Sequence, residues 1–187
     1  MVRRNLTQIA DERVALATGH GRQHWFTLLD VVGAPAWKKG RIAAFLSDEG
    51  LSGWWSDALA VEYHDAADRH LSQLGDAPHA FAGVTLASDV DDVWDHLADD
   101  AERAAWLGQE WPAEAPDART LRLKLPDDSE ASLEVVGPAQ LSDGHESMSA
   151  VRVRVEHIGL ADQKTAERME EFWNGALERL AGAVVGF

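Results

Sequence analysis

The chain has 187 residues, 45% of them hydrophobic and 26% charged, and its formal net charge at pH 7 is −15. This acidity excludes the summed attraction to phosphate that nonspecific binding to nucleic acid or to an anionic membrane needs. The absence of cysteine excludes disulfides, iron–sulfur clusters and cysteine-ligated zinc, and it fits a reducing cytosol. No run approaches the ~18 apolar residues of a membrane span. We therefore expect a cytoplasmic protein without membrane insertion or nucleic-acid binding.

The first predicted unit, residues 1–75, is an all-helical module. Apolar residues recur at helical spacing in three stretches, at 23–32, 37–49 and 52–74. The third stretch, which includes Trp54, Trp55 and Tyr63, is apolar on more than one side. A helix of this kind needs two neighbours. We expect it to dock on the rest of the chain or to form a homodimer.

The second predicted unit, residues 76–187, carries most of the negative charge. It has 23 acidic and 9 basic side chains, whereas residues 1–75 have 9 and 8. Residues 81–87 alternate like a strand, and Ser88 then begins a helix as its N-cap. A short second helix is predicted at 100–107.

Three segments of alternating apolar residues follow a predicted loop that contains Pro112 and Pro116. They lie at 121–125, 131–135 and 151–155, and charged side chains fill the alternate positions. Such alternation predicts an antiparallel sheet with one dry face and one solvated, charge-paired face. A final amphipathic helix at 162–184 would be roughly 30 Å long at ~1.5 Å per residue, which is enough to cross a small sheet.

This order of elements resembles the helix-grip fold of START-like (SRPBCC) domains. The resemblance rests on Ser88–Leu97 leading to Trp106, and on Val151–Leu160 leading into Glu171–Trp173. These segments look like the first-helix and last-strand signatures of the branch related to the activator of the heat-shock protein 90 ATPase. The resemblance covers residues 79–187.

A second resemblance concerns the helical part of the chain. Residues 18–69 resemble a short helical module that precedes START-like domains in bacterial proteins of unassigned function. The segments 25–29, 42–46 and 54–63 carry this similarity.

The first resemblance implies an α+β protein whose antiparallel sheet wraps around the long C-terminal helix. START-like domains enclose a cavity between these two layers and bind lipids, polyketides, hormones or other apolar molecules. The chain is short between Gly108 and Ser149, so we expect a reduced number of strands. The residues expected to line a cavity are Trp94, Trp106, Trp111, Leu123, Val153, His157, Met169 and Trp173.

His157 is the most informative of these candidates. By parity with Val151, Val153 and Val155 it falls on the dry face of the sheet, just before the chain turns into the last helix. A buried imidazole there needs hydrogen-bond partners. It can be a ligand contact, a proton-transfer group, or a core histidine that joins the last strand to the helix.

Function is less strongly indicated than fold, because familiar catalytic and phosphate-binding motifs are missing. His20 and His24 would share one helix face but supply only two ligands, so we expect no metal and no cofactor. We expect noncatalytic binding of a hydrophobic small molecule or lipid between the sheet and the C-terminal helix. One alternative is a protein-interaction or co-chaperone-like module that uses the acidic face at Asp89–Glu102. Another is a cyclase- or hydrolase-type enzyme that uses His157.

Overall fold

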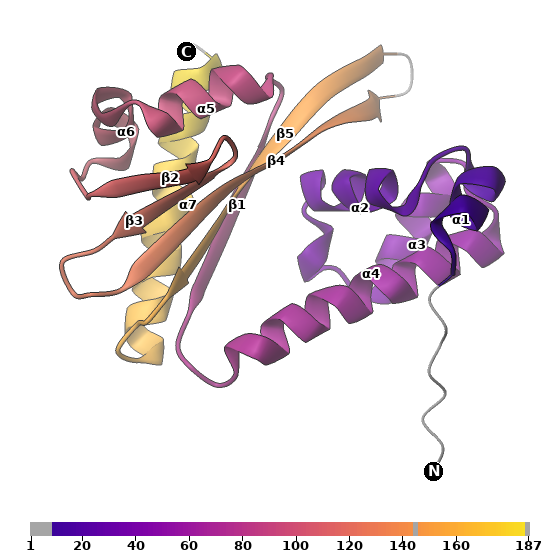
Figure 1. Cartoon of the computed structure of the whole chain (residues 1–187), viewed down its shortest axis with the longest axis horizontal. Coiled ribbons are helices and arrows are strands. Elements are labelled where there is room, and N and C mark those ends of the chain that lie inside the picture. Colours follow the sequence, from indigo (N-terminus) through magenta and orange to yellow (C-terminus); the bar gives the residue numbers. More distant parts are fainter. Residues whose placement is uncertain (1–8, 144–145, 186–187) are drawn as a thin grey trace.

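The computed structural model describes residues 9–143 and 146–185 and confirms the predicted α+β class (Figure 1). Its N-terminal part is helical. It contains α1 (Asp11–Thr18), α2 (Arg22–Val31), a short 3-10 turn (Ala34–Ala36), α3 (Lys39–Asp48) and α4 (Gly53–Leu74). The last three α-helices match the predicted stretches. Helix α1 was not predicted, because Val14 is its single buried residue and it has no apolar stripe to detect.

The second part of the chain contains the sheet. Its elements are β1 (Ala80–Leu86), α5 (Val90–Ala98), α6 (Asp100–Leu107), β2 (Ala113–Asp117), β3 (Thr120–Lys124), β4 (Glu130–Asp143), β5 (Glu146–Ile158) and α7 (Gln163–Val185). The strand order is β1-β5-β4-β3-β2, and every neighbouring pair is antiparallel. Five strands confirm the expected small sheet.

One predicted loop is wrong in part. Residues 113–117, which include Pro116, form the edge strand β2 and pair with β3. Proline is tolerated at an edge because one side of an edge strand makes no ladder hydrogen bonds. The five residues of β2 are mostly exposed and lack an apolar alternation, so the sequence pattern contained little strand signal.

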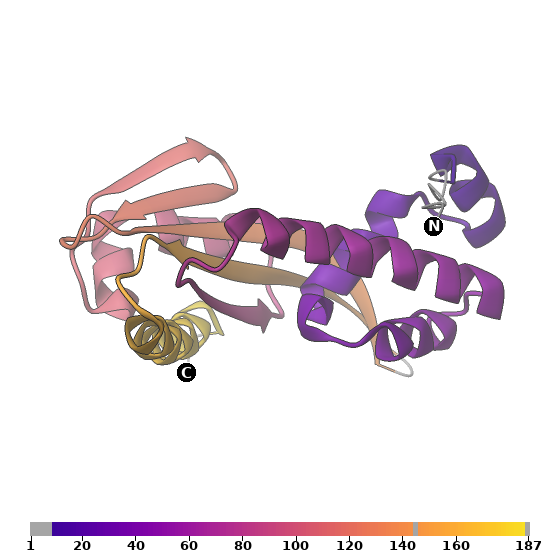
Figure 2. The same cartoon turned by 90° about the horizontal axis from the view of Figure 1, so that it is seen from below.

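The inner face of the sheet is apolar, as predicted. The register places Leu121 of β3 opposite Leu133 of β4, and Leu133 opposite Val155 of β5. All three side chains are buried. Helix α7 lies against this face (Figure 2), and α5 and α6 pack at one end of it (Figure 1). The result is one continuous core between the sheet and these three helices.

The outer face differs from the prediction of a solvated, charge-paired surface. The hairpin of β4 and β5 extends past the other strands, and α2 packs against it (Figure 1). Val136, Ala139 and Ala150 of the hairpin belong to the same buried cluster as the apolar side chains of α2, α3 and α4. The sheet therefore has helices on both faces. Whether residues 1–75 fold as a separate domain stays a prediction.

No helix within residues 9–143 and 146–185 combines the length and apolar character needed to cross a membrane.

Candidate functional site

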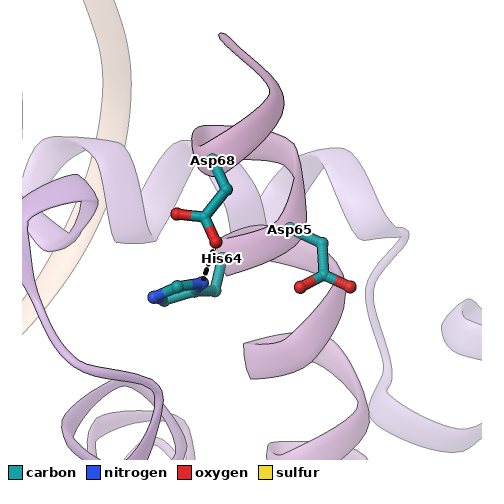
Figure 3. A group of neighbouring side chains, drawn as sticks. All are labelled: His64, Asp65 and Asp68. Atoms are coloured by element: carbon teal, nitrogen blue, oxygen red, sulfur yellow. Dashed lines mark ion pairs between the residues drawn. The ribbon is translucent and has the colours of Figure 1, made fainter. Parts of the chain in front are cut away.

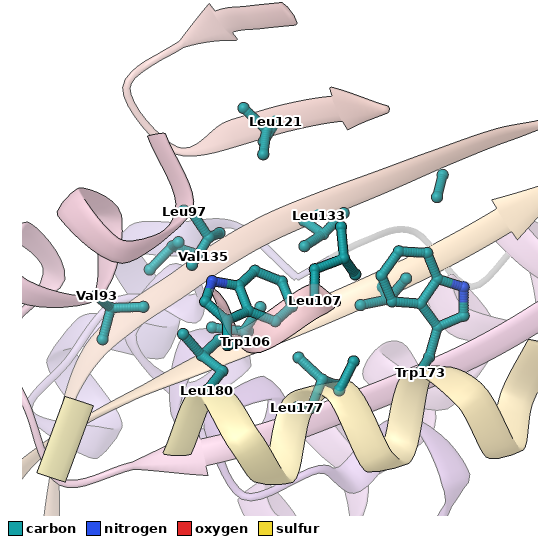
Figure 4. Packing of buried hydrophobic residues seen from close by; sticks show 14 of the residues in the cluster. Val93, Leu97, Trp106, Leu107, Leu121, Leu133, Val135, Trp173, Leu177 and Leu180 are labelled. Carbon is teal, nitrogen blue, oxygen red and sulfur yellow. The ribbon is translucent and has the colours of Figure 1, made fainter. Parts of the chain in front are cut away.

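The space between the sheet and α7 is filled with side chains. Trp173, Leu177 and Leu180 project from α7 toward the strands, and Trp106 lies among them (Figure 4). Each of these four side chains is at most 2% exposed. The predicted cavity region is thus a packed core.

The structure brings most of the predicted cavity residues together. Trp106, Leu123, Val153 and Trp173 are buried in one apolar cluster. The other apolar candidates, Trp94, Trp111 and Met169, are half-buried and pack against that cluster. His157 is fully buried beside Trp173. Their proximity agrees with the sequence-based set, but a role in ligand binding stays a prediction.

His157 has a hydrogen-bond partner on each ring nitrogen. The indole Nε1–H of Trp173 donates to His157 Nδ1 at 3.1 Å, so Nδ1 is an unprotonated acceptor. The neutral imidazole must then carry its proton on Nε2, which lies 2.8 Å from Ser129 Oγ. Ser129 in turn donates to Asp127 Oδ1 at 2.5 Å.

The direction of these hydrogen bonds limits the chemistry of His157. Its Nε2–H donates toward Ser129, whereas a general base that activates a serine must accept from it. Burial lowers the pKa of His157, and the charge of Asp127 opposes that shift only in part. Ser129 is 1% exposed, so it also lacks access to a substrate. This geometry is that of a hydrogen-bonded core histidine.

A half-exposed aromatic cluster lies at the edge of the filled layer. The ring of Trp111 is 5.5 Å from that of Phe172 and 5.8 Å from that of Trp173, measured between centroids. Trp111 and Phe172 are half-buried, and Met169 is half-buried one turn before Phe172 on α7. Trp111, at its predicted position beside the loop, is therefore one of the places where the core reaches the surface.

The acidic face at Asp89–Glu102 contains a surface hollow. Its volume is about 540 Å³, and it is lined by Asp95, Ala98, Asp99 and Glu102. Asp99 is the N-cap of α6, because its Oδ1 accepts from the backbone N–H groups of Ala101 and Glu102 at 2.9 Å.

Few carboxylates of this face have a cationic partner. The one ion pair among its described residues joins Asp100 to Arg103. Arg103 is buried, and its guanidinium donates to the carbonyl of Leu97 at 2.9 Å, which completes the end of α5. Asp95 and Glu102 are exposed and have no ion pair with any described residue.

A second polar group, which the sequence interpretation missed, joins α2 to the outer face of the sheet. Tyr63 Oη donates to Asp30 Oδ1 at 2.6 Å, and the guanidinium of Arg154 lies 3.5 Å from the same carboxylate oxygen. Arg154 also donates to Glu134 at 2.5 Å. We call Asp30, Tyr63, Glu134, Arg152 and Arg154 the junction cluster. Its sequence signal is weak: Asp30 interrupts the apolar run of α2, and Tyr63 is the single tyrosine.

Burial perturbs the charged groups of the junction cluster. Desolvation raises the pKa of Asp30, and the hydrogen bond from Tyr63 counteracts part of that rise. Desolvation and the neighbouring carboxylate raise the pKa of Tyr63, so its hydroxyl stays a donor. Desolvation lowers the pKa of Arg152, and the charge of Arg154 adds to this effect.

Arg152 fits closely between α2 and β1. Its guanidinium donates to Thr85 Oγ1 at 3.0 Å, and the Thr85 hydroxyl donates to the carbonyl of Val31 at the end of α2. A Cβ at Gly83 would lie 2.7 Å from a guanidinium nitrogen, and one at Gly33 would lie 3.1 Å away. The two glycines leave the room that this side chain occupies.

The remaining cations of the sheet were expected to pair across strands. Arg154 does contact Glu134, but Glu156 pairs with His70 of α4 at 2.9 Å instead. The second hollow, of about 250 Å³, lies on the outer face of β2, β3 and β4. It is lined by Pro112, Glu114, Arg122, Lys124 and Glu130. Its two cations and two carboxylates balance, so it favours neither sign of ligand.

One group of possible metal ligands occurs among the described residues, on α4. His64, Asp65 and Asp68 offer ligand atoms within 4.8 Å of one another. Figure 3 shows the contact between His64 Nδ1 and Asp68 Oδ2, which are 3.1 Å apart, with Asp65 beside them. Asp65 Oδ1 lies 3.4 Å from Lys39 Nζ. Asp65 thus already has a lysine ammonium as its partner. A histidine and an aspartate four residues apart share one helix face, and this spacing is the sequence signal that could have indicated the group.

The two histidines weighed earlier as metal ligands stack on each other. The ring centroids of His20 and His24 are 3.9 Å apart with an angle of 19° between the planes. Burial and the charge of His20 lower the pKa of His24. Stacked rings do not direct two nitrogens at one ion, and these residues offer no third ligand.

Comparison with known proteins finds weak structural neighbours and no family. No protein-family model and no curated protein matches the chain. Among solved structures, DynU16, from the dynemicin biosynthetic locus, matches 56% of this chain and 46% of its own length, with 18% identity and a TM-score of 0.32. An uncharacterised protein from Bacillus thuringiensis matches 57% of this chain and 98% of its own, with 13% identity and a TM-score of 0.30. TM-scores of this size do not assign a family.

Proposed function

We propose that this protein is a noncatalytic interaction module of the START-like superfamily, and that its acidic α5–α6 surface binds a basic segment of a partner protein. The observation that carries the proposal is the hollow lined by Asp95, Asp99 and Glu102. All three side chains are exposed, and none of them has an ion pair with a described residue.

Electrostatics explains why such a surface favours a basic partner. Like charges that are close together and unpaired oppose folding and attract cations from solution. A lysine- or arginine-rich segment would neutralise them, and long-range attraction would also accelerate the encounter. The packed layer beneath α5 and α6 supports the same proposal, because a close-packed core fixes the two helices that carry the acidic side chains.

The test is an NMR titration of the whole protein with a short lysine- and arginine-rich peptide. The informative variant combines Asp95→Asn, Asp99→Asn and Glu102→Gln; asparagine retains the N-cap function of position 99. The matched control combines Glu167→Gln, Glu170→Gln and Glu171→Gln, which remove the same charge from exposed positions of α7.

We expect shifts confined to α5 and α6, and affinity about tenfold weaker in the first variant, since three exposed ion pairs contribute ~0.2–1 kcal/mol each. The control should bind like the wild type. Equal weakening in both triple variants would show general attraction to an acidic protein and would contradict the proposed site.

A second candidate function is binding of a hydrophobic small molecule or lipid between the sheet and α7. The observation that favours it is the half-exposed cluster of Trp111, Phe172 and Met169 at the edge of that layer. Because the layer is filled, a ligand would have to displace α7 from the sheet. Titration with fluorescent fatty acids or aromatic polyketides tests this candidate. Quenching of tryptophan emission that decreases in Trp111→Phe would support it, and no quenching by any of them would count against it.

A further inference from the structure

A chain of hydrogen bonds runs from the surface of the sheet to the centre of α7. Asp127 is exposed on the turn between β3 and β4, whereas Ser129, His157 and Trp173 are at most 1% exposed. The bonds join Asp127 to Ser129, Ser129 to His157, and His157 to Trp173, with separations of 2.5, 2.8 and 3.1 Å. We call these four residues the α7 latch. It is the polar link that crosses the otherwise apolar layer at this point.

The latch is satisfied only while His157 is neutral. The neutral ring accepts at Nδ1 and donates at Nε2, which matches the indole N–H of Trp173 on one side and the hydroxyl of Ser129 on the other. A protonated ring carries a hydrogen on both nitrogens. Its Nδ1–H would point at the Trp173 N–H, two donors would face each other, and the hydrogen bond to α7 would be lost.

The surroundings offer the protonated ring little compensation. Strands β1 and β4 place Ala80 and Ala131 opposite His157, and α7 places Trp173 against it. Asp127 is the one charged group with an effect on His157 among the described residues, and Ser129 lies between them. A buried cation that has lost a partner favours any state in which it reaches water.

We propose that the α7 latch is a proton-sensitive switch: protonation of His157 breaks its contact with Trp173 and loosens α7 from the sheet. Loosening would expose Leu177, Leu180 and the apolar row of the inner sheet face. The latch shares no residue with the acidic α5–α6 surface and is tested by other variants, so its failure and the failure of the proposed function are separate outcomes.

The direction of the pH effect follows from linkage. The closed state lowers the pKa of His157 below its usual 6.5, whereas an open state that exposes the ring restores it. Opening is therefore independent of this residue above pH 6.5. Below that value it becomes more favourable by up to about tenfold per pH unit, until the closed state also binds the proton.

The first measurement is amide hydrogen exchange on the whole protein at pH 7 and at about pH 5.5. We expect the opening equilibrium of α7 amides to rise, by up to about tenfold, relative to that of amides in α3, which serve as an internal reference for global unfolding. Equal changes in α7 and α3, or no change in α7, would overturn the proposal.

The second measurement is the pKa of His157 by NMR in two variants. Trp173→Phe keeps an aromatic ring in the core but removes the N–H that opposes the proton, so the pKa of His157 should rise toward its usual value. Trp106→Phe is the matched control, since its indole N–H donates to the carbonyl of His96 at 2.9 Å and not to His157. If the two variants left the pKa of His157 equal, the latch would have no role. His157→Gln should abolish the pH response of α7 exchange.

Discussion

The two faces of the sheet are covered by different means. On the inner face, α5, α6 and α7 bury a cluster of leucine, valine and tryptophan side chains, with the α7 latch as its polar link at His157. On the outer face, α2 meets the sheet through the small apolar patch of Val136, Ala139 and Ala150 together with the charged junction cluster. The sheet thus has one hydrophobic interface and one mixed interface.

This difference means that the two interfaces of the sheet should respond differently to mutation, pH and salt. Apolar burial is nondirectional and insensitive to salt, whereas a half-buried ion pair depends on geometry, pH and ionic strength. Removing a core side chain should therefore destabilise the inner layer far more than removing a polar group destabilises the outer one.

Truncation of the inner layer should have the largest effect. Trp173→Ala removes a fully buried indole, and we expect a loss of ~3–5 kcal/mol in the free energy of unfolding from lost burial and the cavity left behind. Urea denaturation monitored by circular dichroism measures it. Trp54→Ala is the matched control, because Trp54 is 63% exposed and should change stability by less than ~0.5 kcal/mol. Similar losses in both variants would contradict the packed inner layer.

Removing the hydroxyl of Tyr63 should have an intermediate effect. Tyr63→Phe keeps the ring and deletes the 2.6 Å hydrogen bond to Asp30, which leaves a half-buried carboxylate with one donor fewer. We expect a loss of ~1–3 kcal/mol. A double-mutant cycle with Asp30→Asn gives the coupling energy, which should be clearly nonzero. Additive effects of the two substitutions would show that the bond contributes nothing to docking of α2.

Removing a cation of the junction cluster should matter less. Arg154→Gln breaks the contacts with Asp30 and Glu134, but the Arg154 side chain is 38% exposed, so we expect a loss of about 1 kcal/mol that shrinks as salt is added. Lys39→Gln is the control, since its pair with Asp65 is about half exposed on both sides and should contribute less. Stability curves in low and high sodium chloride measure both.

The smallest expected effect is the pH response of Asp30. Its pKa is raised in the folded protein above the usual 3.8, so folding takes up a proton at this site. The resulting stabilisation is fully present below pH 3.8 and is lost as the pH rises through the raised pKa. The stability of the wild type relative to Asp30→Asn should fall over that interval. In Tyr63→Phe the pKa of Asp30 should rise further; a fall measured by NMR would contradict the assigned contacts.

Much of the fold was predictable because the relevant signals are local. Helical spacing located α2, α3 and α4. Alternation located β3, residues 131–135 of β4 and residues 151–155 of β5. Parity placed His157 on the inner face, where it is fully buried. Helix α1 and strand β2 escaped prediction because neither buries enough apolar surface to produce a periodic pattern.

The candidate sites were harder to predict because their residues are far apart in the chain. Asp30 and Tyr63 come from two helices, and Arg154 from the last strand, and nothing in their local sequence links them. The latch partners of His157 posed the same difficulty: Ser129 lies in a turn and had no recognisable motif. His157 and Trp173 were both among the predicted cavity residues, but the hydrogen bond between them was not anticipated.

Spacing along the chain was sufficient to establish which side chains face inward, since the backbone repeats of helices and strands are constant. It established the α+β class, the antiparallel pairing and the apolar stripe of α7. Whether the inner layer encloses a cavity depends on the summed volume of side chains that meet from five strands and three helices, and on how closely those elements approach. Only the tertiary structure sets which side chains meet and how closely the elements approach. Here Trp106, Trp173 and Leu177 pack into the space between the sheet and α7.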